Sequence, residues 1–128
     1  MTEVVGKIEN RVIELLGIEH SEDSNIYMGD SNIKHMLEKH PYEFDKYKND
    51  IRQILAQPDY IGLHNNSIEY VKEYQQDEEY VKIAVRTSLQ DKYYARTIYT
   101  MNKKRVESFI KNGRLIEYNV KEDVDYNT

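Results

Sequence analysis

The chain has 128 residues, of which 39% are hydrophobic and 32% are charged, with a formal net charge of −5 and no cysteine. This length fits a single domain over residues 1–128, with one core. The lack of cysteine excludes disulfides and thiolate metal ligands and is typical of a cytoplasmic protein. Since no apolar run approaches the roughly 18 residues that a membrane helix needs, no membrane partner is expected.

Apolar residues at helical spacing predict three helices in the first half of the chain. Glycine follows the first helix, and a proline follows each of the other two, because proline cannot continue a helix and disfavours helical geometry in the residue before it. A short extended piece, "NIYMG", is predicted between the first and second helices. The expected helices span residues 3–16, about 32–40 and 42–56.

After residue 58 the spacing of the apolar residues changes from the helical period to the alternation of strands. Four segments rich in Tyr, Val, Ile and Thr predict an antiparallel meander, namely "DYIGLH", "SIEYVKEY", "EYVKIAVRTS" and "YYARTIYTM". A helix capped by Asn102, an edge strand in "RLIEYN" and an acidic tail complete the chain. The predicted fold class is α+β, with N-terminal helices packed on one side of a roughly four-stranded antiparallel sheet, plus a C-terminal helix. The opposite face would expose Tyr beside Arg or Lys, which suits base stacking and phosphate binding.

Basic residues are concentrated in the second half of the chain. From Lys82 to Arg114 there are nine basic residues against two acids, a net charge of +7, so the remainder carries −12. Such asymmetry can create a positive field on one face of an acidic protein, as a nucleic-acid partner requires. The alternative is a set of solvated strand and helix faces that never converge, and the sequence leaves both open.

Two of the four histidines, His35 and His40, lie in the second predicted helix. Their spacing would separate them by about 140° around a continuous helix, unlike the i, i+4 pair of zinc proteases, so no metal site is predicted. The sequence also lacks a glycine-rich phosphate loop and a Gly-x-Ser-x-Gly elbow. No cofactor is expected.

Metal-independent RNA cleavage is compatible with the residue types present. It needs a base for the 2′-hydroxyl, an acid for the leaving 5′-oxygen, and cations or hydroxyl donors for the charged phosphorane. Histidine suits the first two roles because its ordinary pKa lies near working pH. The candidate residues are His35, His40, Lys34, Arg86, Arg96, Thr97 and Tyr99.

Each candidate also has a purely structural explanation. His40 continues the apolar stripe of its helix and could cap the core, whereas His35 lies off the stripe and could simply be exposed. The strand arginines could be solvated residues that protect the sheet. On a regular strand Thr97 and Tyr99 would face away from Arg96, so a single site would require a bulge or a strong twist.

The segments "IKHMLEKHP", "IRQILAQPDYI", "YVKIAVR" and "ARTIYTMN", in this order, resemble the phage-encoded nuclease domains of the barnase, EndoU, colicin and RelE superfold, abbreviated BECR. The similarity extends from about Asn25 to Tyr118. It implies a nuclease-like core at 25–118, with an accessory N-terminal helix at 1–17 and a flexible tail at 119–128. The resemblance also implies metal-independent cleavage of RNA, often transfer RNA, in phages, mobile elements or toxin systems.

The family's histidine pair ending in His-Pro falls on His35 and His40, and its hydroxyl residue followed two positions on by an aromatic falls on Thr97 and Tyr99. The working hypothesis is a phage- or toxin-type endoribonuclease in which His35 acts as general base or acid and His40 positions it or shares the task. The other expected roles are phosphate binding by Arg86, Arg96 and Tyr99, a hydrogen bond to the phosphate from Thr97, and substrate binding by Lys34 and Lys82.

Two rival hypotheses remain at this point. One is a catalytically inactive BECR-like module that binds RNA or a host protein through the same sheet, and the other is a small structural phage protein. A protein inhibitor is a further candidate partner in the nuclease hypothesis.

Overall fold

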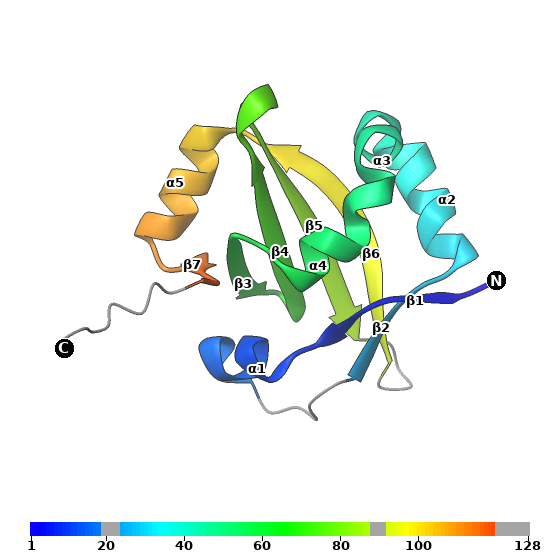
Figure 1. Cartoon of the computed structure of the whole chain (residues 1–128), viewed down its shortest axis with the longest axis horizontal. Helices are drawn as coiled ribbons and strands as arrows, with labels where there is room; N and C mark the ends of the chain where they lie inside the picture. The colour runs from blue at the N-terminus through cyan, green and yellow to red at the C-terminus, as the bar shows by residue number, and fades with distance from the viewer. Residues whose placement is uncertain (19–23, 88–91, 120–128) are drawn as a thin grey trace.

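A computed structural model describes residues 1–18, 24–87 and 92–119. In these residues a single sheet of seven strands has the order β1-β2-β6-β5-β4-β3-β7 (Figure 1). β2 and β6 run parallel, and every other neighbouring pair is antiparallel. The strands are β1 (Glu3–Ile8), β2 (Ser24–Met28), β3 (Tyr60–His64), β4 (Ser67–Tyr74), β5 (Glu79–Thr87), β6 (Tyr93–Met101) and β7 (Ile116–Glu117).

The fold is α+β, but the predicted architecture of N-terminal helices on a roughly four-stranded antiparallel sheet is wrong. The four predicted strands are present as the meander β3–β6. The sheet is larger because the antiparallel pair β1–β2, whose strands are separated by α1 in the chain, adds to the β6 side through a short parallel contact of Ile26 and Tyr27 with Tyr93 and Tyr94. At the other edge the predicted last strand is β7, which pairs with β3. The sheet is therefore mixed.

The predicted helix over residues 3–16 is wrong in its first half. Residues 3–8 form the edge strand β1, and α1 (Asn10–Leu16) begins only after Glu9. A bulge between Val4 and Gly6 interrupts the two-residue alternation of β1. Because of this interruption, the apolar residues of the strand coincide with helical spacing. The first segment is thus part of the sheet and not an accessory helix.

The remaining helices agree more closely with the sequence. α2 (Asp30–Lys39) ends before His40, as Pro41 predicts, but the helix expected at 42–56 is divided into α3 (Pro41–Tyr47), a 3₁₀ turn (Lys48–Asp50) and α4 (Ile51–Ala56). α5 (Lys103–Lys111) begins at the predicted cap, where Asn102 Oδ1 accepts a hydrogen bond from the backbone N–H of Arg105 at 2.8 Å. No helix among the described residues has the length and apolar character needed to cross a membrane. The acidic tail from residue 120 lies outside the described residues.

Two cores lie on opposite faces of the sheet. The larger one packs α1, α3 and α4 against one face, where Ile83 and Ile98 are fully buried with Ile54 of α4 (Figure 1). α5 packs a smaller core against part of the other face, through the fully buried Val106. The expectation of an open second face therefore holds only for part of the sheet, because Lys82 lies in the covered part and is 2% exposed.

Candidate active site

Helix α2 lies along the part of β6 that β2 leaves unpaired. Among the described residues β2 pairs with β6 only at Tyr93 and Tyr94, and α2 packs against β6 (Figure 1). Met36 is fully buried in the larger core and holds the helix in place. Its neighbour His35 is exposed and lines a pocket on the second face of the sheet.

A bulge in β6 brings its polar side chains to this face. Thr97 pairs with Ala84, but the next partner, Val85, pairs with Ala95, so Arg96 is the extra residue. Ile98 and Ala95 are both fully buried in the larger core although they are three positions apart. Since a bulge inserts one residue and re-aims the side chains around it, Arg96 joins Thr97 in the same pocket. The bulge that one site would require is thus present.

The pocket has a volume of about 380 Å³ and combines α2 with three strands. Four of the predicted site residues meet in it, and four other residues complete its lining. The predicted ones are His35, Arg86, Arg96 and Thr97, and the others are Ser31, Asn32, Ser67 and Ala84.

Within the described ranges, the positive charge in the pocket has no acidic counterpart. The pocket's lining includes two arginines and no Asp or Glu, and neither arginine forms an ion pair with any acid in the described part of the chain. Arg86 Nε donates to Ser67 Oγ at 3.3 Å. This hydrogen bond orients the guanidinium and does not involve its two Nη groups. Unpaired guanidinium groups that share a pocket favour a bound anion, above all a phosphate.

His40 and Tyr99 do not line the pocket but are linked to it through His35. The imidazole of His40 stacks on the ring of Tyr99 with 5.5 Å between centroids and meets the imidazole of His35 edge-on at 6.3 Å. His40 is half-buried, at the junction of α2 and α3. The two histidines are therefore neighbours, although a continuous helix would have separated them, because the chain leaves helical geometry at His40 with φ −138° and ψ 56°.

Lys82, predicted to bind substrate, lies inside the protein. Its Nζ donates to Glu69 Oε2 at 2.7 Å and sits 4.6 Å from the centroid of the Tyr99 ring. Arg114 adds two hydrogen bonds to the same carboxylate, at 3.0 and 3.3 Å. Burial tends to raise the pKa of Glu69, but the hydrogen bonds from Arg114 and Lys82 outweigh it and lower that pKa. Lys82 thus contacts the ring of Tyr99 and does not line the pocket.

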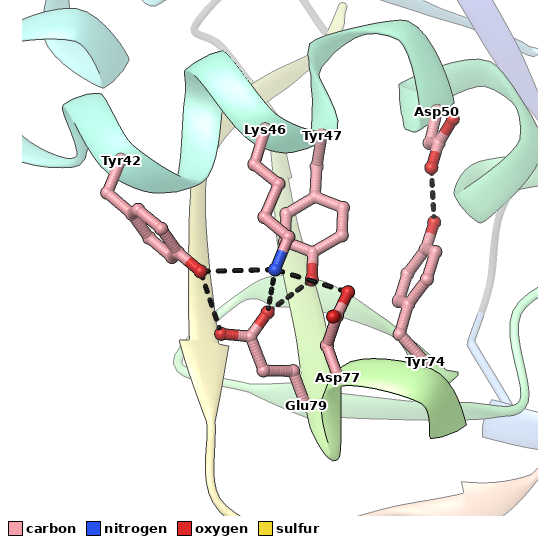
Figure 2. Close-up of polar contacts among 7 residues, drawn as sticks. All are labelled: Tyr42, Lys46, Tyr47, Asp50, Tyr74, Asp77 and Glu79. Carbon is pink, nitrogen blue, oxygen red and sulfur yellow. Dashed lines mark hydrogen bonds and ion pairs between the residues drawn. The ribbon is translucent and has the colours of Figure 1, made fainter.

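A second polar cluster fastens α3 to the sheet (Figure 2). Lys46 Nζ contacts the Tyr42 hydroxyl at 3.1 Å, Glu79 at 3.2 Å and Asp77 at 3.2 Å, and the hydroxyl of Tyr47 donates to Glu79. The hydrogen bond with Tyr42 is the main cause that raises the pKa of Lys46, whereas burial and then Glu79 raise the pKa of Tyr47 to about 12. Because α3 begins directly after His40, this anchor adjoins the histidine in the chain.

The sequence did not single out the serine and asparagine residues of the pocket. Ser67 could have been found from the hairpin, since Asn65 and Asn66 both have positive φ, as a two-residue turn requires. That turn pairs His64 with Ser67, and in the separate β4–β5 register Ser67 lies opposite Arg86. The predicted substrate-binding residue Lys34 is exposed on α2, outside the pocket.

A metal site would need about three potential ligands to meet in one place. Within the described ranges, no three His, Asp or Glu side chains are grouped in a way that could hold a metal ion.

The comparison with protein families decides the class of protein. A family model described as phage-Barnase-EndoU-ColicinE5/D-RelE like nuclease3 matches residues 3–108. The chain belongs to this family. The resemblance noted in the sequence is therefore confirmed, and the protein is a nuclease of the BECR type. The match begins at β1, so it includes the N-terminal segment that the resemblance had left outside. No match was found among curated proteins or among solved structures.

Proposed function

We propose that the protein is an endoribonuclease that cleaves RNA without a metal ion. The observation that carries this proposal is the pocket in which one imidazole, from His35, faces two arginines that have no acidic partner within the described residues. An imidazole can move the proton, and guanidinium groups can stabilise the phosphorane that forms. The family membership makes a nucleic acid the substrate class.

The proposed reaction uses the 2′-hydroxyl of RNA as its nucleophile. His35 takes the proton of this hydroxyl while the 2′-oxygen attacks the adjacent phosphorus. The bond between phosphorus and the 5′-oxygen then breaks, and the leaving oxygen takes a proton from water, while His40, which does not line the pocket, positions His35. The products are a 2′,3′-cyclic phosphate and a 5′-hydroxyl. DNA lacks the nucleophile and should not be cut.

The other residues take supporting roles in this proposal. Arg86 and Arg96 bind the non-bridging phosphate oxygens, and Thr97 donates a hydrogen bond to one of them. Tyr99 does not line the pocket, so its proposed role changes from phosphate binding to positioning His40, on which it stacks. Lys82 in turn holds the Tyr99 ring.

A silent RNA-binding module is the second candidate function. It is favoured by the fact that, among the described residues, His35 is the one histidine that lines the pocket, whereas efficient cleavage uses both a base and an acid. In this alternative the two arginines would still bind phosphate, but the pocket would release the RNA intact.

Cleavage of a defined RNA in EDTA distinguishes the two functions. A single-stranded RNA labelled at one end, and a DNA of the same sequence, are incubated with the wild type and with His35→Ala, Arg96→Ala and Lys39→Ala. Lys39 is an exposed cation on the same helix and outside the pocket, so its removal controls for net charge.

The wild type and Lys39→Ala should cut the RNA but not the DNA. The cut RNA should carry 2′,3′-cyclic phosphate ends. Loss of His35 should slow cleavage by about 10²- to 10⁴-fold, the usual value of general acid–base catalysis, and loss of Arg96 by about 10²-fold. Intact RNA with the wild type, or equal rates for His35→Ala and the wild type, would reject the nuclease mechanism. Binding without cleavage would support the silent module.

A further inference from the structure

A second hollow adjoins the proposed active-site pocket. It has a volume of about 450 Å³ and shares Ser31, Asn32 and Arg96 with the first pocket. Its other lining residues are Met1, Thr2, Gly29, Asp30 and Tyr94. The two hollows are therefore consecutive, with the guanidinium of Arg96 common to both.

The β6 bulge explains this arrangement. Tyr94 pairs with Arg86 in the register beyond the bulge, so it points to the same face as Arg86 and Thr97. Along β6, Thr97 lines the first hollow, Arg96 lines both and Tyr94 lines the second. A threonine, an arginine and a tyrosine thus follow one another along β6 at two adjoining hollows.

Tyr94 is suited to stacking. Its ring is half-buried and lies 5.9 Å from the ring of Tyr27, at an angle of 42°. The neighbour restrains the Tyr94 ring, so less side-chain freedom is lost when a ligand binds. Aromatic rings beside a cationic groove are the usual platform for the bases of single-stranded nucleic acids, because every base has a π face.

We propose that the second hollow is a nucleotide subsite, in which the base next to the cleaved phosphodiester stacks on Tyr94 while Arg96 holds the phosphate between the two nucleotides. This inference rests on the proposed function, in which the first pocket is the site of cleavage. It adds a binding site for a neighbouring nucleotide that the first pocket does not contact. The subsite binds a single-stranded segment, since a base in a duplex has both faces covered by its neighbours.

Binding of short RNAs that cannot be cleaved tests the subsite separately from catalysis. The probes are 2′-O-methyl RNAs of two and of five nucleotides, read by fluorescence anisotropy, and the same pentanucleotide with 2-aminopurine at each position in turn, whose emission falls when the base stacks on an aromatic ring. The proteins are the wild type, Tyr94→Ala and Tyr94→Phe, each checked for an unchanged circular dichroism spectrum and urea midpoint. The phenylalanine variant keeps the ring and loses only the hydroxyl.

The wild type should bind the pentanucleotide more tightly than the dinucleotide and should quench 2-aminopurine at one position. Tyr94→Ala should weaken pentanucleotide binding about tenfold and abolish that quenching, whereas Tyr94→Phe should behave as the wild type. Unchanged pentanucleotide binding in Tyr94→Ala, or an equal loss for both lengths, would overturn the subsite. If the protein shows this length dependence but leaves cleavable RNA intact, the nuclease proposal is rejected and the subsite proposal is retained.

Discussion

The buried charge cluster below Tyr99 allows a test that does not depend on the substrate. Lys82 and Glu69 are 2% and 5% exposed at their side chains, and Arg114, at 22%, keeps part of its hydration. Removing one partner of a buried ion pair costs about 3–5 kcal/mol, because the other charge stays in the interior without compensation. The two partners of this pair should nevertheless differ in their effects.

Glu69→Gln should lower the free energy of unfolding by about 3 kcal/mol, since the Lys82 ammonium loses its carboxylate. Lys82→Met should cost about 1 kcal/mol, because Glu69 keeps the two hydrogen bonds from Arg114. The double variant should be more stable than Glu69→Gln alone, since no buried ammonium remains. Urea denaturation at pH 7 measures all three. Equal losses for the single variants, or strictly additive losses in the double variant, would refute this account of the cluster.

The same cluster predicts a dependence on pH. Because the folded-state pKa of Glu69 is lowered, its contribution to stability is complete above the ordinary glutamate pKa of about 4.3 and is lost as pH falls through the folded value. The difference in stability between the wild type and Glu69→Gln should therefore shrink as pH is lowered below about 4. A difference that stays constant in acid would contradict the assignment.

Three other substitutions test separate features. Gly62→Ala should cost about 1–3 kcal/mol in urea denaturation, since the new Cβ would lie 2.2 Å from the backbone oxygen of Arg114, and an unchanged midpoint would be inconsistent with this contact. Thr97→Val should leave stability unchanged or raise it by about 1 kcal/mol, because its buried Oγ1 has no hydrogen-bond partner in the described residues, yet it should slow RNA cleavage; a loss of stability would point to a structural hydroxyl. Tyr47→Phe should cost about 1 kcal/mol through the lost bond to Glu79 and should remove a phenol that titrates at about pH 12 in ultraviolet absorbance; an unaltered titration curve would argue against that contact.

The meander, the end of α2 and the start of α5 could be predicted because their signals are local. Alternating apolar residues mark the strands, and Pro41 and Asn102 mark helix boundaries. β1 could not be recognised, since its bulge shifts the alternation and leaves Val4, Val5 and Ile8 at spacings that a helix also shows. The interior Gly6, which costs about 1 kcal/mol in a helix, was the signal against the helical interpretation.

The candidate site was predictable in its residue types and not in its assembly. The meeting of His35 with the β6 residues depends on α2 lying beside β6, which in turn depends on the parallel contact of β2 with β6. That contact involves residues more than sixty positions apart and leaves no pattern in the local sequence. The position of Arg96 depends on the bulge in β6, and the sequence around it has no glycine, proline or asparagine that would indicate a bulge. Lys82 was predicted to bind substrate but is buried. The alternation of residues along its strand cannot reveal that α5 covers one end of the polar face.

The parallel contact between β2 and β6 has a consequence for synthesis of the protein. The pocket takes its first side chain at Ser31 and its last at Thr97, and α2 packs against β6, so the pocket is complete only when β6 is in place. A polypeptide growing on the ribosome thus holds an incomplete pocket until β6 has emerged and docked. For the proposed ribonuclease, this order means that the active site is assembled only after most of the chain has left the ribosome, which is itself rich in RNA.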